Sequence, residues 1–277
     1  MEFTKMHGLG NDFLVFEDDG TGRDWNAVAK KVCTRRLSVG GDGIMVVLPS
    51  TEADVRMRII NADGSEAEMC GNGIRCFAKY VYEHGIVNKE DMTVETLAGI
   101  IKPKLIVENG RVMDVCVDMG VPKFDRASIP MQGEGIAENV EIEAAGRHVK
   151  VSSVLMGVPH TMVLVDDIEA VDATVLGPAI ERHSIFPRKS NVNFVQVLDS
   201  ENIRVLTWER GAGLTLACGT GSCASGVETY RKRLTGSRVN VHLSVGRLII
   251  ETTEDGRVLM TGPAEEVYTA TLNDEID

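Results

Sequence analysis

The chain has 277 residues, 43% hydrophobic and 25% charged, which is enough apolar material for a folded core and excludes a largely disordered protein. Its formal net charge of -12 would repel phosphate backbones and anionic lipids, so we expect neither nucleic acid nor a membrane as partner. The sequence shows neither a long apolar run nor a secretory signal, so we expect a cytoplasmic protein whose cysteines are mostly thiols.

Short alternating apolar segments predict a strand-rich first half. The predicted strands are 13–17, 44–48, 54–60, 92–97 and 100–108. Helices are predicted at 25–37, after the candidate N-cap Asp24, and at 72–84. Gly120 and Pro122 interrupt the pattern and predict a domain boundary near 118–124.

The second half has a similar composition of elements. Helices are predicted at 174–183 and 220–234, and strands at 148–156, 161–166, 192–198, 203–208, 238–245, 247–253 and 257–261. Strands and helices do not alternate regularly, which argues against a doubly wound parallel sheet and favours an α+β fold.

A short motif occurs twice. Residues 70–76 and 218–223 both contain Cys-Gly-x-Gly, then a second cysteine, then a helical pattern. The duplication indicates one structural unit used twice, and therefore two related halves.

The repeated motif has a clear chemical use at a helix N-terminus. Exposed N–H groups and the helix dipole there favour a bound carboxylate, and they are expected to lower the pKa of an adjacent thiol. Two such cysteines on opposite sides of an amino acid could racemise it: a thiolate takes the α-proton from one face, and a thiol delivers a proton to the other.

Cysteines can also be structural, bind zinc or accompany a nucleotide-binding loop. Cys33, Cys76, Cys116 and Cys223 are interpreted as structural, because cysteine is often a small buried apolar residue. A zinc site would need paired Cys-x2–4-Cys spacings, which residues 70–76 do not supply. A dinucleotide-binding loop would need a third glycine that both segments lack.

Further motifs accompany the cysteine segments along nearly the whole chain. They are His-Gly-Leu-Gly-Asn-Asp-Phe at 7–13, Gly-Gly-Asp-Gly at 40–43, Asn-Ala-Asp-Gly-Ser at 61–65, Pro-His at 159–160, Asn-Val-Asn-Phe at 191–194 and Glu-Arg-Gly-Ala-Gly at 209–213. With them the chain resembles the diaminopimelate epimerases, within the cofactor-independent amino-acid epimerases and racemases.

The resemblance implies an isomerase that converts LL-2,6-diaminopimelate to meso-diaminopimelate in lysine and cell-wall precursor biosynthesis, with no pyridoxal phosphate and no metal. It implies two pseudo-symmetric domains, each a β-sheet or barrel wrapped around a central helix. We expect residues 1–119 with 264–277 in one domain and 120–263 in the other. Many family members are homodimers, so a homodimer is expected.

The resemblance also implies roles for individual residues. Cys70 and Cys218 match the catalytic cysteines, and His160 and Glu209 match the pair that assists proton transfer. The remaining matches, together with Glu209, are to substrate-binding positions: Asn11, Asn61, Gly71, Asn72, Asn191, Arg210, Gly219 and Thr220.

Two positions depart from the family pattern. Val158 stands where the family commonly has an asparagine before Pro-His, and Gly43 stands where some members have glutamine. A racemase for another polar amino acid is therefore the alternative, although Arg210 favours a substrate with a second carboxylate. A non-catalytic binding protein is the alternative from another class, and two intact cysteine motifs argue against it.

Overall fold

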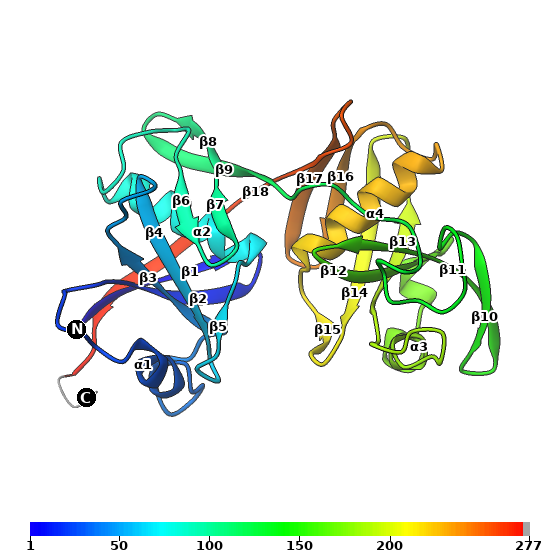
Figure 1. Ribbon diagram of the computed structural model, residues 1–277, viewed down its shortest axis with the longest axis horizontal. Coiled ribbons are helices and arrows are strands. Elements are labelled where there is room, and N and C mark those ends of the chain that lie inside the picture. Colours follow the sequence, from blue (N-terminus) through cyan, green and yellow to red (C-terminus); the bar gives the residue numbers. More distant parts are fainter. Residues whose placement is uncertain (274–277) are drawn as a thin grey trace. The chain divides into compact units, whose positions relative to one another are not determined.

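The computed structural model describes residues 1–273 and divides the chain into two compact units. Unit 1 comprises Met1–Val117 and the segment that begins at Gly262, and unit 2 comprises Asp118–Thr261. Residues 274–277, which we assigned to the N-terminal domain, lie outside the described residues. Both units consist of a sheet and a few helices, so the fold is α+β (Figure 1).

Unit 1 is built mainly from short strands. Its elements are β1 (Glu2–Gly8), β2 (Asn11–Glu17), α1 (Trp25–Val32), β3 (Gly43–Leu48), β4 (Val55–Asn61), β5 (Glu66–Ala67), α2 (Gly71–Glu83), β6 (Val94–Thr96), β7 (Gly99–Ile101), β8 (Lys104–Glu108), β9 (Arg111–Asp118) and β19 (Glu265–Thr271). The main sheet runs in the order β19-β1-β2-β3-β4-β6-β7, and β5 pairs with β4.

Unit 2 uses the same kinds of element. They are β10 (Val140–Ala144), β11 (Arg147–Met156), β12 (Val158–Leu164), the 3-10 helix η1 (Ile168–Ala170), α3 (Ala173–Glu181), β13 (Asn191–Val197), β14 (Asn202–Glu209), β15 (Gly213–Thr215), α4 (Gly219–Arg231), β16 (Arg238–Leu243), β17 (Gly246–Thr252) and β18 (Val258–Gly262). The sheet order is β10-β11-β12-β13-β14-β16-β17-β18, with β15 paired to β14.

The two sheets repeat one pairing scheme. In unit 1, β1 and β2 are antiparallel, β2 and β3 parallel, β3 and β4 antiparallel, and β4 and β6 parallel. In unit 2, β11 to β14 and β16 follow the same sequence of orientations. The cysteine helix stands at the same place in both schemes, between β5 and β6 or between β15 and β16. The repeated motif therefore marks a repeated fold unit, as predicted.

Each cysteine helix is central to its own sheet. α4 packs against β11, β12, β13, β14, β16 and β17, and α2 packs against β1, β2, β3 and β19. Apolar residues of the helix are buried there: Ile74, Cys76 and Phe77 in α2 have no exposed surface. A helix enclosed by sheet on several sides is held firmly, which fixes the position of its first turn.

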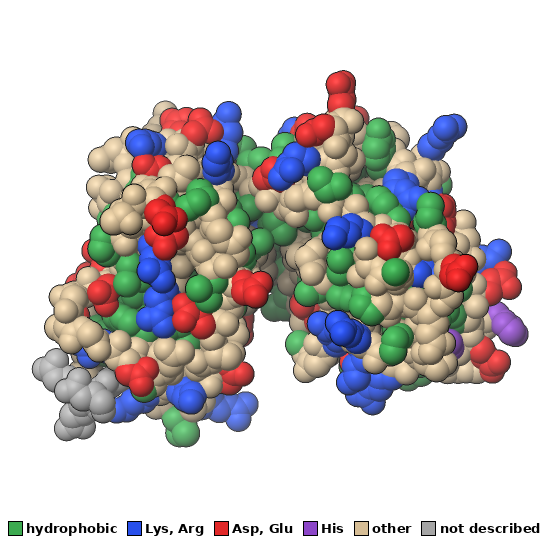
Figure 2. All heavy atoms as spheres, in the orientation of Figure 1, with side chains coloured by type: hydrophobic (Ala, Val, Ile, Leu, Met, Phe, Trp, Pro, Cys, Tyr) green, Lys and Arg blue, Asp and Glu red, His purple; other side chains and the backbone are tan. Residues whose placement is uncertain are grey.

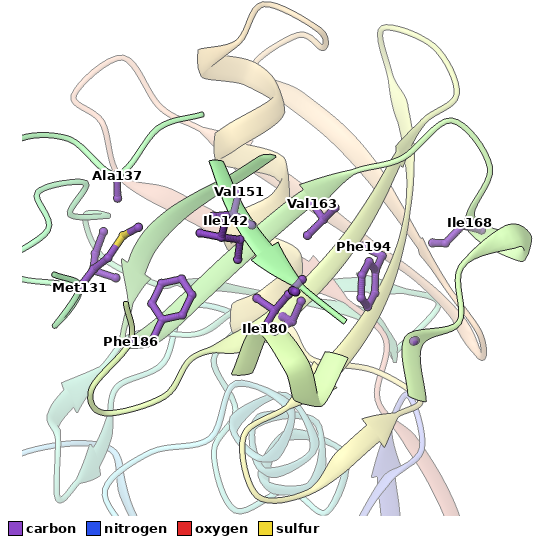
Figure 3. Packing of buried hydrophobic residues seen from close by; sticks show 13 residues of the cluster. Met131, Ala137, Ile142, Val151, Val163, Ile168, Ile180, Phe186 and Phe194 are labelled. Carbon is purple, nitrogen blue, oxygen red and sulfur yellow. The ribbon is translucent and has the colours of Figure 1, made fainter. Parts of the chain in front are cut away.

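A second apolar layer in unit 2 lies between the sheet and α3. Phe186, Ile180 and Phe194 point toward one another there, and Ile142 and Val163 complete the centre of the cluster (Figure 3). These residues come from β10, β12, β13, α3 and the loop before β13, so the cluster joins the strands to α3.

Several predicted boundaries differ from the structure. The helix predicted over 25–37 begins at Trp25, where the Asp24 carboxylate accepts from two backbone amides, but it ends at Val32. Arg36 has φ 71°, which a continuing α-helix excludes. The strand predicted over 100–108 is broken into β7 and β8 at Pro103, which has no N–H for the ladder. Six strands were not predicted: β1, β5, β9, β10, β15 and β19.

Charges of both signs are interspersed over the visible face of each unit (Figure 2). Within residues 1–273, no helix is long and apolar enough to cross a membrane.

Candidate active site

Cys70 is the N-cap of α2. Its backbone is extended, at φ -139° and ψ 122°, and its Sγ accepts from the Gly73 N–H at 3.4 Å. The thiol therefore lies at the positive end of the helix dipole, beside the amides of the first turn. This is the position predicted from the motif.

Asn11 is the side chain that meets Cys70. A tight turn through Leu9 and Gly10, with φ 55° and 85°, ends β1 and starts β2 at Asn11. The Asn11 Oδ1 lies 3.6 Å from the Cys70 Sγ and accepts from Asn72 Nδ2 at 3.3 Å. Three predicted site residues thus come together in unit 1.

Two residues without a predicted role hold this group in place. Asp42 accepts from Asn11 Nδ2 at 2.7 Å, which turns the amide oxygen toward Cys70. Arg75 is fully buried and donates to Asn72 Oδ1 at 3.0 Å and to the backbone oxygens of Gly71 and Pro263. Asp42 lies in the motif at 40–43 and Arg75 in the motif at 70–76. Membership of these motifs was the only feature of the sequence that could have indicated a role for them.

Asn61 lies at the end of β4 and is exposed. Its Nδ2 donates to Ser65 Oγ at 2.9 Å, across the turn that leads to β5. Because this bond uses the amide nitrogen, the amide oxygen can still accept a hydrogen bond.

Cys218 is the N-cap of α4, in the same extended conformation as Cys70, with φ -124° and ψ 111°. It is only 5% exposed. Burial, followed by the adjacent Glu209 carboxylate, raises the pKa of the Cys218 thiol to about 12. The expectation that the helix end would lower this pKa is wrong for the unliganded chain, because desolvation and a like charge outweigh the helix amides.

His160 approaches Cys218 through Thr220. The His160 Nε2 lies 2.9 Å from Thr220 Oγ1, which lies 3.6 Å from the Cys218 Sγ. Burial, with Arg210 nearby, lowers the pKa of His160 to about 3, so its imidazole is neutral. The predicted residues His160, Thr220 and Cys218 thus form one connected group.

Three further predicted residues lie at the adjoining ends of β13 and β14. Glu209 ends β14, and Asn191 begins β13. The Asn191 Oδ1 accepts from the Arg210 backbone N–H at 2.7 Å, while the Arg210 guanidinium donates to the Arg188 oxygen at 3.0 Å. The Arg210 side chain belongs to an exposed residue and can reach a dissolved anion.

The strand registers show which residue of unit 1 corresponds to Val158, where the sequence departs from the family pattern. Phe13 of β2 pairs with Gly43, and His160 of β12 pairs with Asn191. Asn11 and Val158 each lie two residues before these pairs, so Val158 occupies in unit 2 the place of Asn11 in unit 1. Its side chain is 37% exposed, so an apolar group stands where the other unit has an amide.

The remaining cysteines have a structural environment. Burial raises the pKa of Cys33 to about 11 and that of Cys76 to about 12, and Cys223 has no exposed surface. Thiols of this kind react slowly. Cys70 and Cys218 differ from them by standing at helix N-termini among polar side chains.

The fold is found in several solved structures of low sequence identity. One is a probable proline racemase from Agrobacterium radiobacter, with a TM-score of 0.70 and 17% identity, covering 99% of this chain and 93% of that one. Another is a phenazine biosynthesis protein of the PhzF family from Bacillus anthracis, with a TM-score of 0.72 and 17% identity, covering 98% of both chains. At this identity the likeness concerns the fold alone.

Sequence relatives are much closer. A diaminopimelate epimerase from Caldanaerobacter subterraneus subsp. tengcongensis is 54% identical, over 97% of this chain and 98% of its own length. One from Pelotomaculum thermopropionicum is 51% identical, over 97% of both. The diaminopimelate epimerase family model matches residues 3–124 and 152–267. The chain therefore belongs to the diaminopimelate epimerase family.

Proposed function

We propose that this chain is an isomerase that interconverts LL-2,6-diaminopimelate and meso-diaminopimelate, on the route to lysine and cell-wall precursors, without pyridoxal phosphate or a metal. The observation that carries the proposal is a cysteine at the N-cap of the central helix in each unit, Cys70 and Cys218. The relatives of 54% and 51% identity, named diaminopimelate epimerase, support the choice of substrate.

The two cysteines act as base and acid on one α-carbon. One, as thiolate, forms an S–H bond with the α-proton, and the electron pair of the broken C–H bond moves into the carboxylate. The other, as thiol, gives its proton to the opposite face of the carbon and becomes a thiolate. The roles exchange in the reverse direction.

Backbone amides stabilise the charge that develops on the carboxylate. The first turns of α2 and α4 present the amides of Gly71 and Asn72, and of Gly219 and Thr220. Donors already fixed in a helix need no reorganisation when the charge appears, which is the basis of oxyanion stabilisation. Asn11, Asn61, Asn191 and Arg210 bind the other polar groups of the substrate, and Arg210 takes the distal carboxylate.

Glu209 and His160 adjust the protonation of Cys218. The Glu209 carboxylate raises the pKa of the neighbouring thiol, so it favours the protonated form that acts as acid. His160 is neutral and reaches the same sulfur through Thr220. The hydrogen bond with Thr220 lowers the pKa of the Cys218 thiol, in opposition to Glu209.

The first test is proton NMR of reduced enzyme with LL-diaminopimelate in D2O, beside a panel of other L-amino acids. We expect the α-proton signal of diaminopimelate to disappear as the meso isomer forms. Exchange with another amino acid and none with diaminopimelate would keep the two-cysteine chemistry but replace the substrate, in line with the apolar Val158.

Cys70→Ser and Cys218→Ser should each lower turnover at least about a thousandfold, because a serine hydroxyl is far less acidic than a thiol. The matched control is Cys116→Ser, at a half-buried strand position outside the site. The rate of deuterium incorporation is the readout, and wild-type rates in either site variant would contradict the two-base assignment.

A homodimer is proposed through β19. This strand forms one edge of the unit 1 sheet, and its Val267 and Tyr268 are 54% and 44% exposed. The backbone groups on the outer side of an edge strand can pair with a second copy of the same edge. Val267→Lys should yield a monomer in light scattering, whereas Leu164→Lys, at an exposed position of β12, should not.

A cytoplasmic location is also proposed, because the two catalytic thiols must stay reduced. Cell fractionation tests this location.

A further inference from the structure

Asn193 is a buried amide behind the unit 2 site, with no assigned role. It lies in β13, has no exposed surface and contacts three groups of the site region. Its Nδ2 lies 3.2 Å from His160 Nδ1, and its Oδ1 accepts from Thr207 Oγ1 at 2.9 Å. A Cβ placed on Gly221, in the first turn of α4, would lie 2.4 Å from the same oxygen.

Thr207 sets the orientation of the Asn193 amide. Thr207 is 2% exposed, so its hydroxyl proton requires an acceptor inside the protein. The Asn193 oxygen supplies that acceptor, which leaves the NH2 group facing His160. An amide nitrogen only donates, so His160 Nδ1 must accept and carries no proton.

The tautomer of His160 then determines the direction of the next hydrogen bond. A neutral imidazole without a proton on Nδ1 carries it on Nε2, which donates to Thr220 Oγ1. Thr220 is left with its own proton to donate, and the Cys218 sulfur lies 3.6 Å away. A hydroxyl that donates to sulfur stabilises the thiolate relative to the thiol.

We infer that Asn193 is a positioning residue: held by Thr207, it fixes His160 as the Nε2–H tautomer and thereby makes Thr220 a hydrogen-bond donor to Cys218. The inference rests on the proposed function, in which Cys218 must become a thiolate once per turnover. A relay of donors directed toward the sulfur partly offsets the burial and the Glu209 charge that favour the thiol.

Comparison of the two repeated units supports a specific role for Asn193 in unit 2. In unit 1, Asn72 stands at the position of Thr220, and the Cys70 Sγ lies 3.6 Å from an acceptor, Asn11 Oδ1. In unit 2, Thr220, His160 and Asn193 are instead joined in a chain of hydrogen bonds, in which His160 and Asn193 are fully buried. A side chain at Gly221, in the first turn of α4, would displace the Asn193 oxygen, so the motif glycine leaves room for this amide.

The test uses the full chain with imidazole-15N histidine and no substrate. Long-range proton–nitrogen spectra identify the tautomer, and His160→Gln identifies the His160 signals. We expect a protonated Nε2 and an unprotonated Nδ1 in the wild type. Asn193→Asp, whose carboxylate only accepts, should place a proton on Nδ1. Thr207→Val, which removes the donor that orients Asn193, should give a mixture of tautomers and covers the case in which Asn193→Asp fails to fold.

The second readout is alkylation of Cys218 at pH 9, followed by peptide mass spectrometry. Asn193→Asp and Thr207→Val should each slow this alkylation about three- to tenfold. A tenfold change corresponds to a rise of about one unit in the pKa of the Cys218 thiol. Thr220→Val should slow it equally while the His160 tautomer stays unchanged, and Thr220→Ser should restore the rate. Thr235→Val is the matched control, because it removes another buried hydroxyl of unit 2, bonded to Thr229.

A proton on Nδ1 of wild-type His160 would overturn the inference. So would a folded Thr207→Val variant, judged by circular dichroism, with the wild-type tautomer and the wild-type alkylation rate. Neither readout uses diaminopimelate, so a failure of the proposed substrate would leave both results interpretable.

Discussion

The two proposed catalytic cysteines have different surroundings although their backbones match. Cys70 is half-buried and faces an amide oxygen, whereas Cys218 is 5% exposed and faces a hydroxyl and a carboxylate. Burial and Glu209 hold Cys218 in the thiol form near neutral pH. This protonated form suits Cys218 to the role of acid in the proposed two-base mechanism.

The role of Glu209 can be checked through the reactivity of Cys218. Glu209→Gln removes the negative charge that raises the pKa of this thiol, so a larger fraction becomes thiolate. We expect Cys218 in this variant to react severalfold faster with iodoacetamide at pH 8. Glu201→Gln is a control at an exposed carboxylate between β13 and β14, and an unchanged rate in Glu209→Gln would contradict the electrostatic assignment.

His160 should make the fold sensitive to acid. Its pKa is about 3 in the folded chain and its ordinary value is 6.5. Below pH 6.5 the unfolded chain binds a proton that the folded chain does not, so stability is complete above that pH and falls toward pH 3. Between pH 7.5 and 5 the wild type should lose about 2 kcal/mol of unfolding free energy relative to His160→Gln. Urea denaturation at both pH values measures this, and equal losses would refute it.

The cysteines were identifiable from sequence because all their determinants are local. Cysteine, glycines and a helix start lie within four residues at 70–73 and again at 218–221. Asp42 and Asn193 act through partners on other strands, so no spacing in the chain indicates their contacts. The pKa of Cys218 was mispredicted for the same reason, because it depends on burial and on Glu209.

At the level of elements, the second glycine of each motif serves packing. A Cβ on Gly73 would lie 2.7 Å from Ile59 Cδ1, and one on Gly221 would lie 2.4 Å from Asn193 Oδ1. These glycines let the helix start close to the neighbouring strand.

Gly221→Ala should therefore destabilise the protein even though alanine favours helix. Overpacking against a buried amide costs about 1–3 kcal/mol, which exceeds the gain of at most about 1 kcal/mol in helix propensity. Gly236→Ala is the control, because the nearest atom to its Cβ would be 3.8 Å away. Urea unfolding of both variants is the measurement, and equal stability would show that the α4 turn can yield.

The prediction of elements succeeded where the apolar pattern is strong. The core strands β3, β4, β13 and β14 and both cysteine helices were placed within a few residues. The missed strand β19 is largely exposed, so its residues carry little alternation. β10 does alternate, as Val-Glu-Ile-Glu-Ala, but over five residues only. β1 was missed although its centre is buried. The strand leads directly into the Leu9–Gly10 turn, so no separate apolar segment marks its end.

For the whole molecule, the two-base proposal predicts a reversible inactivation by peroxide. Two thiols that serve one substrate can be oxidised to a disulfide, with hydrogen peroxide reduced to two waters. We expect activity to fall, a peptide that links Cys70 and Cys218 to appear in mass spectrometry, and dithiothreitol to reverse both. Inactivation without that peptide and without recovery would contradict the prediction.

The pairing of β19 with β1 also bears on how the protein is made. The chain starts unit 1, passes through all of unit 2, and only then supplies the strand that covers β1. At roughly 5–20 residues per second, a ribosome leaves the buried side chains of β1 without their last neighbour for on the order of ten seconds. Unit 2 is contiguous and can fold first, so unit 1 is completed last and is the part of the nascent chain that most needs protection from aggregation.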